Sequence, residues 1–359
     1  MARFPVPRGA VRPGVGTNQV ATLAAGRKLK QGRHPDPLDP ATPPPDPVRW
    51  TARERDAFES EEMAVFRRSL LLPGSDDIRA SIIDDLATHF QVSPDEVVPR
   101  CLEWESWAAD EWEAAPRETT DQILDFHRRT VATAFDVAWY AYLQAERYLY
   151  PVSVALARTL RPHRPGASHL DFGAGCGATA AFFAQLGYET TLADVSTSLL
   201  EFARFRLARR NIPARFVDLN TATIGEERYD VITAIDVLML VPDLAKTADE
   251  LHRALRPGGV LFTNFDTRPM TRENAWHLYE DDLPLRYTLH RAGFEPEEKL
   301  DGMITRYRRV PRSGPIYVAR GLRDRVLLRP AVRQAVRGAR RLARSITHLP
   351  QVRASGHAG

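Results

Sequence analysis

Two patterns of hydrophobic and polar positions follow one another along the chain. Over residues 50–160, apolar side chains recur every three or four positions, as they do from Ile78 to Leu86, which predicts helices. From residue 167 onward, short apolar runs alternate with longer amphipathic segments, an order typical of a parallel sheet flanked by helices. We therefore expect an α/β domain preceded by a helical domain.

The α/β part is predicted to contain seven strands and four helices. The strands are expected near residues 168–172, 189–194, 214–218, 229–235, 259–265, 294–302 and 315–320. The helices are expected near residues 177–187, 197–210, 244–255 and 282–292. In the helical part, Ser93, Pro94 and Glu96 have the order of an N-cap, a first-turn proline and a capping box. The longest helical pattern breaks near Pro151.

Composition divides the chain into four segments. Residues 1–48 are rich in proline and poor in apolar side chains, which predicts a disordered tail. We assign residues 49–162 to a helical cap domain, residues 163–320 to the α/β domain, and residues 321–359 to a basic amphipathic helix and tail.

Several classes of protein are disfavoured by what the sequence lacks. It contains no run of about eighteen apolar residues and no apolar signal core, so neither a transmembrane helix nor export is expected. Its two cysteines, Cys101 and Cys176, are too few for a disulfide framework. A reducing, cytoplasmic location is therefore predicted.

Charge is distributed unevenly. Residues 51–150 carry 10 basic and 21 acidic side chains, whereas residues 301–359 carry 14 basic and 2 acidic ones. The stretch LATHFQVSPDEVVPR has the rhythm of a helix-turn-helix, but its acidic surroundings argue against nucleic acid as a partner, because phosphate contacts need lysine and arginine.

The C-terminal stretch RVLLRPAVRQAVRGARRLARSITH places arginines on one helical face and apolar side chains on the opposite face. A basic amphipathic helix of this kind, over residues 322–349, binds weakly to an anionic membrane or docks on an acidic partner. The acidic residues 51–150 of the same or another subunit are such a partner, and the oligomeric state stays open.

The stretch HLDFGAGCGATA, residues 169–180, contains the most specific candidate chemistry. A strand is expected to end at Asp171 and Phe172, and a helix to begin near Ala178. Between them, Gly173 and Gly175 allow a sharp turn whose backbone stays open to a ligand at the helix N-terminus. Such a turn serves nucleotide-type ligands, among them dinucleotides and S-adenosyl-L-methionine (SAM).

Asp171 favours SAM over a dinucleotide. A carboxylate beside the turn would repel a pyrophosphate, whereas SAM has an ammonium and a sulfonium and no phosphate. Asp194 ends the second strand, where an acidic side chain would bind ribose hydroxyls in either case.

Five segments in this order resemble class I SAM-dependent methyltransferases. They are HLDFGAGCG, TLADVS, FVDLN, YDVITAIDVLMLVPD and LHRALRPGGVLFTNFD, and they span about 100 residues. The resemblance covers about residues 165–320 and implies a Rossmann-like, seven-stranded, mostly parallel sheet that GFEPEEK and GPIYVARG close as an antiparallel hairpin. It identifies residues 163–320 as the SAM-binding domain and the cap as the substrate domain.

The resemblance also implies roles for individual residues. Asp171, Phe172 and the turn would hold the methionine end, Asp194 and Val195 the ribose, and Asp218 and Leu219 the adenine. Asp236 would lie where the cofactor and acceptor sites meet. The implied cofactor site is therefore Asp171, Phe172, Gly173, Gly175, Gly177, Asp194, Val195, Asp218, Leu219 and Asp236, with no metal ligands.

Methyl transfer requires mainly alignment of donor and acceptor, and a base only where the acceptor keeps its proton. His277, in the insertion NAWHLYEDD after the fifth strand, is the first candidate for that base. Asp236 and Tyr140 are further catalytic candidates, while His127 and His169 are weaker ones.

The predicted function is transfer of a methyl group from SAM to an oxygen or nitrogen of a small molecule, in bacterial specialised metabolism. Two alternatives stay open. One is methylation of a macromolecule or lipid, with the basic C-terminal helix holding the substrate. The other is a SAM-binding regulator or scaffold that transfers no methyl group.

Overall fold

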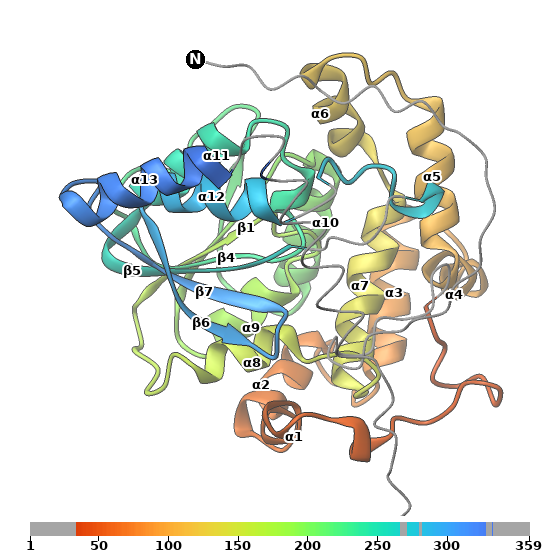
Figure 1. Ribbon diagram of the computed structural model, residues 1–359. Coiled ribbons are helices and arrows are strands. Elements are labelled where there is room, and N and C mark those ends of the chain that lie inside the picture. Colours follow the sequence, from red (N-terminus) through yellow and green to blue (C-terminus); the bar gives the residue numbers. More distant parts are fainter. Residues whose placement is uncertain (1–33, 266–270, 280–281, 328–331, 333–359) are drawn as a thin grey trace, which may run out of the picture.

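Seven strands form one sheet in the computed structural model, which describes residues 34–265, 271–279, 282–327 and 332 (Figure 1). The strand order is β3-β2-β1-β4-β5-β7-β6, and every neighbouring pair is parallel except those that involve β7. The strands are β1 (Ser168–Phe172), β2 (Glu189–Asp194), β3 (Arg215–Asp218), β4 (Tyr229–Ala234), β5 (Leu255–Asn264), β6 (Phe294–Leu300) and β7 (Ile304–Arg309). The predicted α/β fold is confirmed.

Helices cover both faces of the sheet. They are α9 (Ala178–Gln185), α10 (Thr197–Arg209), α11 (Leu244–Ala254), α12 (Leu283–Arg291) and α13 (Pro315–Leu327), with short η2 (Leu238–Leu240) and η3 (Arg272–Asn274). On one face, Leu251 and Leu289 of α11 and α12 pack with Ile232 and Leu261 of the central strands. On the other, α9 and α10 pack against β2. These apolar faces have the helical periodicity that the sequence shows.

The helical cap lies beside the sheet and packs on its α9 side (Figure 1). Its elements are η1 (Pro47–Arg49), α1 (Ala52–Phe58), α2 (Glu61–Leu70), α3 (Ile78–Phe90), α4 (Pro94–Leu102), α5 (Trp104–Ala114), α6 (Thr120–Arg129), α7 (Ala132–Ala145) and α8 (Val152–Arg158). The predicted break near Pro151 falls between α7 and α8. Phe66 of α2 meets Phe182 of α9 edge to face, so the cap and the sheet share one hydrophobic core.

The register of the strands brings the predicted motifs to one edge of the sheet. Asp171 on β1 lies opposite Thr233 on β4, and Asp194 on β2 lies opposite Asp218 on β3. Because these strands are parallel, the loops that follow them emerge at the same edge, where α/β proteins bind ligands.

One part of the predicted sheet is wrong. Residues 315–320 form the start of helix α13, and the closing hairpin consists of β6 and β7, joined by a turn in which Asp301 and Gly302 have positive φ. Only Ile304 and Tyr307 of β7 are buried, so its charged outward side chains concealed the strand. Pro315 suits a first helical position, and the β-branched residues after it gave a false strand signal.

Near the two ends of the described chain, residues 34–46 pack on the cap and residues 315–327 form helix α13. Residues 34–46 contact the cap: His34 hydrogen-bonds Asp136, and the Trp139 ring N–H donates to the carbonyl of Pro35.

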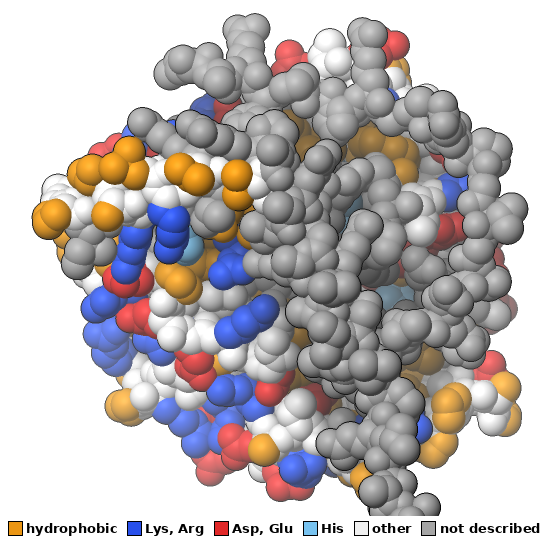
Figure 2. All heavy atoms as spheres, in the orientation of Figure 1, with side chains coloured by type: hydrophobic (Ala, Val, Ile, Leu, Met, Phe, Trp, Pro, Cys, Tyr) orange, Lys and Arg blue, Asp and Glu red, His pale blue; other side chains and the backbone are white. Residues whose placement is uncertain are grey.

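The basic helix predicted over residues 322–349 lies mostly outside the described residues. Within α13, Val318, Leu322 and Val326 are exposed, and they form an apolar row on the surface (Figure 2). The domain boundaries stay predictions.

Candidate functional site

The glycine turn begins where β1 ends and closes on α9. Gly173 has a φ of 71°, and a Cβ there would lie 2.3 Å from Cγ2 of Val237, in the loop after β4. Gly177, the N-cap of α9, has a φ of 73° and packs tightly on Leu192 and Ala203. Only glycine combines these backbone conformations with such close contacts. The turn is therefore wedged between the β4 loop and α10.

Asp171 lies beneath this turn. Its carboxylate accepts a hydrogen bond from the Thr233 hydroxyl at 2.8 Å and does not line the cavity described below. Burial raises the pKa of Asp171 to about 7, although hydrogen bonds from Thr233 and the Ala180 amide oppose the shift. Asp171 therefore acts from inside the fold, whereas the sequence reasoning placed its carboxylate beside the ligand.

Asp194 reaches the ligand side of the same edge. One carboxylate oxygen accepts from the Gly175 amide at 3.0 Å and the other from the Ser196 amide at 2.9 Å. The side chain is only 7% exposed, yet it lines the cavity, and burial raises its pKa. Each oxygen keeps a lone pair for a ligand hydroxyl. The carboxylate thus ties the glycine turn to the start of α10 and presents its edge to the cavity.

The loop after β3 completes this end. The Leu219 amide donates to the Asp194 carbonyl at 3.0 Å, and Leu219 lines the cavity. Asp218 does not line it, because its carboxylate accepts from the amide and side chain of Asn220. Asn220 also donates to the Val195 carbonyl at 2.8 Å, which joins the β2 and β3 loops.

Asp236 occupies the loop after β4 in a left-handed conformation, with a φ of 56°. Such a conformation costs a non-glycine residue about 1–3 kcal/mol and persists only where its surroundings fix it. Here Asn264, at the end of β5, accepts from the Asp236 amide at 2.7 Å and donates to its carboxylate at 2.5 Å. The pair joins the β4 and β5 loops at the cavity wall.

A single cavity of about 1460 Å³ runs from the glycine turn to the cap. Its volume exceeds the roughly 300–1,000 Å³ of an ordinary small-molecule pocket, so it has room for two ligands. At the turn end its lining is Phe172, Gly173, Gly175, Asp194, Val195, Ser196, Leu199, Leu219, Ala222, Thr223 and Ile224. At the cap end its lining includes Trp104, Phe126, His127, Thr130, Thr133, Tyr140, Trp276 and His277.

Two of the predicted catalytic residues line the cap end of the cavity. Tyr140 comes from α7, and His277 comes from the insertion after β5, which Arg272 ties to Asp110 and Glu113 of α5 (Figure 1 shows it beside α5). Asp236 lines the cavity between the two ends. His169 is wholly buried under the sheet, hydrogen-bonded to Thr233, and lies outside the cavity.

The structure places His127, a weaker candidate from the sequence, in the lining of the cavity. It lines the cavity from α6, and burial, together with the charge of His277, lowers its pKa to about 4. The signal was available in TDQILDFHRR, where Ile123, Phe126 and His127 follow a helical period. What the sequence could not show is that α6 meets the insertion after β5.

Sequence reasoning missed a buried ion cluster that supports the turn from the cap. Asp85 of α3 is fully buried, and its carboxylate accepts from Arg206 of α10 at 3.1 Å, with Arg209 and Arg210 also within ion-pair distance. Arg206 in turn donates to the Cys176 carbonyl, inside the glycine turn, at 2.7 Å. A cap helix therefore holds the turn through one arginine.

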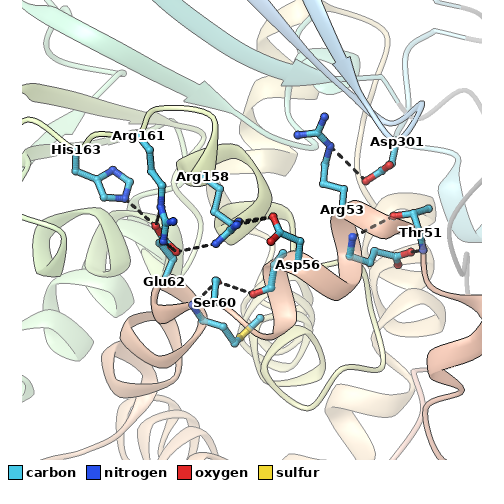
Figure 3. Close-up of polar contacts among 12 residues, drawn as sticks. Thr51, Arg53, Asp56, Ser60, Glu62, Arg158, Arg161, His163 and Asp301 are labelled. Atoms are coloured by element: carbon cyan, nitrogen blue, oxygen red, sulfur yellow. Dashed lines mark hydrogen bonds and ion pairs between the residues drawn. The ribbon is translucent and has the colours of Figure 1, made fainter.

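A second cluster of similar make-up lies away from the turn (Figure 3). The carboxylate of Glu62 on α2 is only 3% exposed and pairs with Arg158, Arg161 and His163. Although burial alone would raise its pKa, the hydrogen bond from Arg161 is among the contacts that lower it to about 2. This cluster joins the cap to α8 and the segment before β1, and none of these four residues lines the large cavity.

Comparisons with known proteins identify the family of the α/β domain. Residues 170–261 match the family model described as a methyltransferase domain. The malonyl-[acyl-carrier protein] O-methyltransferase of Pseudescherichia vulneris is 28% identical over 184 residues, 51% of this chain and 70% of that protein. The protein of the same name from Enterobacter lignolyticus is 30% identical over 183 residues, 50% of this chain and 68% of that protein.

The chain belongs to the class I SAM-dependent methyltransferases. Among solved structures, the methyltransferase resembles Haemonchus contortus phosphoethanolamine N-methyltransferase 2, solved in complex with SAM. The TM-score is 0.40 at 19% identity, with 48% of this chain and 44% of that chain covered.

The cofactor of this methyltransferase is SAM, and the turn end of the cavity fits it. None of the described residues that line that end is lysine or arginine, whereas Asp194 is acidic. This lining suits a cationic, phosphate-free nucleoside and gives a diphosphate no counter-charge. When bound, SAM supplies a methyl group on a positively charged sulfur.

Proposed function

We propose that this methyltransferase acts on an oxygen or nitrogen atom of a small molecule held between the cap and the sheet. The observation that supports the proposal is the continuity of the cavity, which joins the glycine turn to the histidines and aromatic rings of the cap. A donor at one end and an acceptor at the other would meet without crossing solvent. A setting in bacterial specialised metabolism stays a prediction.

The cofactor would lie along the loops that follow β1, β2 and β3. Asp194 would accept hydrogen bonds from both ribose hydroxyls, since its carboxylate lines the cavity and each oxygen accepts one hydrogen bond, from a backbone amide. Phe172, Gly173 and Gly175 would contact the methionine end, with Asp171 adding negative charge from below. Val195 and Leu219 would flank the adenine, and Asp218 and Gly177 would shape this wall without touching the ligand.

The acceptor would lie against α5, α6, α7 and the insertion after β5. The salt bridges of Arg272 hold that insertion against the cap, so the two walls close over the acceptor and limit the entry of water. His277 and Tyr140 would align the acceptor atom, and Asp236 would fix the loop between the two ends. Alignment of this kind supplies much of the rate in a displacement at carbon.

The proposal is tested by following the methyl group. The purified full-length protein is incubated with methyl-labelled SAM and a bacterial extract, and the products are separated by ultrafiltration. We expect the label in the small-molecule fraction and its loss in Asp194→Ala. Label that appears only on protein, nucleic acid or lipid would contradict a small-molecule acceptor.

A carrier-bound acceptor is the second candidate, because the two curated relatives are named for a malonyl group on acyl-carrier protein. In the same experiment that acceptor would appear as label on a protein fraction that mild base releases as methanol, the behaviour of a methyl ester.

A further inference from the structure

The cap end of the cavity is an aromatic chamber, by which we mean the space lined by Trp104, Phe126, Tyr140 and Trp276 together with His127 and His277. Trp104 and Trp276 are 5.9 Å apart between ring centroids, and Phe126 packs edge to face on Trp112 behind the wall. Rings on several sides favour a planar, apolar ligand.

His127 contributes a buried polar atom to the lining of this chamber. Its Nε2 atom is buried and has no hydrogen-bond partner among the described residues. Its ring meets Phe126 edge to face. Because burial and then the charge of His277 lower its pKa to about 4, the imidazole is neutral at neutral pH. A buried nitrogen of this kind needs a partner, which a ligand hydroxyl would supply.

The charges around the chamber select against anions. The described lining residues of the cap helices and the insertion include Glu105, Asp121 and Asp136, but no lysine or arginine. The described lysine and arginine residues that line the cavity lie on other elements. Lys246 is on α11, Arg286 is on α12 and Lys299 is on β6. A carboxylate or phosphate on the acceptor would therefore meet like charge at this end.

The helix that bears His127 is fixed to the cofactor end. Arg128, the next residue, donates to the Asn220 side chain at 2.6 Å. Asn220 donates in turn to the Val195 carbonyl, in the loop that follows Asp194. His127 is thereby held at a set distance from the loop that would contact the ribose.

We propose that His127 is the proton acceptor for an uncharged aromatic hydroxyl compound, a phenol in chemical class, bound in the aromatic chamber. This inference rests on the proposed function and names its acceptor class. It reverses the order of the two histidines that the sequence suggested, and leaves His277 as a neighbour of His127 in the chamber wall.

The chemical step balances. A bond forms between the phenol oxygen and the methyl carbon, the carbon–sulfur bond breaks with its electron pair going to sulfur, and the hydroxyl proton passes to His127 Nε2. One positive charge leaves the sulfur and one appears on the imidazole, so the net charge of the chamber is unchanged. The other titratable side chains lining this end are His34, which pairs with Asp136, and His277, Glu105, Asp121, Asp136 and Tyr140. Of these, only His277 is among the causes of the lowered pKa of His127.

Binding is tested first, by calorimetry on the full-length enzyme loaded with S-adenosylhomocysteine. The probes are naphthol (the beta isomer), naphthoate, which replaces the hydroxyl with a carboxylate, and decahydronaphthol, which is not planar. We expect naphthol to bind at least about 10-fold more tightly than either relative. His127→Phe should weaken naphthol binding about 3- to 10-fold, the effect of one hydrogen bond. Equal or tighter binding of naphthoate, or no binding of naphthol, would overturn the acceptor class.

Turnover of naphthol then tests the proton transfer. His127→Gln keeps a hydrogen-bond acceptor but no base, so naphthol should still bind while kcat falls about 100-fold or more. The wild-type rate should be flat through neutral pH and fall only as the pH approaches about 4. The Gln variant should instead speed up with rising pH, toward the phenol's own pKa of about 10. A Gln variant with the wild-type rate and pH profile, or a wild type that binds naphthol without methylating it, would refute the assignment.

His89→Gln is the matched control. His89 is half-buried against aromatic rings, and burial lowers its pKa too, yet it lies outside the cavity. It should leave binding and turnover of naphthol unchanged. Calorimetry with SAM separates the two proposals: a wild type that binds SAM but not naphthol loses only this inference, whereas one that does not bind SAM loses the proposed function as well.

Discussion

Replacing Asp171 with asparagine should remove a loss of stability that the wild type suffers as the pH rises, and should weaken binding of the cofactor. The carboxyl group is buried under the glycine turn, and burial raises its pKa from 3.8 to about 7. The folded protein therefore binds this proton more tightly than the unfolded chain does. The free energy of unfolding must then fall as the pH rises between those two values.

The size of the effect follows from the shift. Each pKa unit corresponds to about 1.4 kcal/mol, so ionising Asp171 between about pH 5 and pH 8 costs the wild type about 2–3 kcal/mol of stability. Asparagine has no proton to lose. It does place an amide N–H₂ where Asp171 accepts hydrogen bonds, and that cost does not depend on pH. Between about pH 5 and pH 8, the free energy of unfolding of the variant minus that of the wild type should therefore rise by about 2–3 kcal/mol.

The assay is urea unfolding of both proteins at about pH 5 and pH 8, followed by tryptophan fluorescence, with SAM binding measured by calorimetry at each pH. The wild type should bind SAM more tightly at the higher pH, because a cationic ligand favours the ionised carboxyl, and the variant should show no such dependence. A stability difference that changes by less than about 1 kcal/mol between the two pH values would refute the reasoning.

Four further substitutions are tested by calorimetry with SAM, three at the cofactor end and Glu62→Gln as the control for Asp85→Asn. Asp194→Ala should weaken binding by about 1.5–3 kcal/mol, the value of charge-assisted hydrogen bonds, and unchanged affinity in a folded variant would contradict the ribose contact. Gly173→Ala should abolish binding, because its Cβ would lie 2.3 Å from Val237, and retained binding would show that the turn is not rigid. Asp85→Asn should cost about 3–5 kcal/mol of stability and weaken SAM binding, whereas Glu62→Gln should lower stability alone. Equal effects of the last two on SAM would contradict the connection from Asp85 to the turn.

The parallel strands and the glycine turn could be predicted from the sequence because each is determined by residues that are close together along the chain. Strand β1, SHLDF, is short and mostly buried, and the glycines after it are the residues that adopt the positive φ of the turn at little cost, so the segment HLDFGAGCG indicates this conformation by itself. The family and the cofactor followed from these segments and are confirmed. The closing hairpin was misplaced because the sequence of β7, ITRYRR, has few apolar residues. Only Ile304 and Tyr307 are buried, and the other four side chains, which are polar or charged, are at least partly exposed.

The acceptor end was harder to predict for a different reason. Asp85 and Arg206 are 121 positions apart, and each looks like an ordinary helix-surface residue until α3 and α10 meet. His127 and His277 likewise come from separate elements, and only the packing of the insertion against the cap unites them in one cavity. Asp171 shows the opposite error, since its position was predicted correctly but its side chain points into the fold rather than toward the ligand.

No helix among the described residues is long and apolar enough to cross a membrane. The C-terminal helix α13 nevertheless carries an exposed apolar row, Val318, Leu322 and Val326, and its Arg320 pairs with Glu295 of β6. Its continuation lies outside the described residues, so a role for residues 322–349 in membrane binding or self-association stays a prediction.

The most direct measurement is a crystal structure of the enzyme with S-adenosylhomocysteine. The account predicts that the ribose lies on Asp194 and that the sulfur faces the chamber between His127 and His277. A sulfur turned instead toward Lys299 and Gly302, at the β6–β7 end of the cavity, would contradict it.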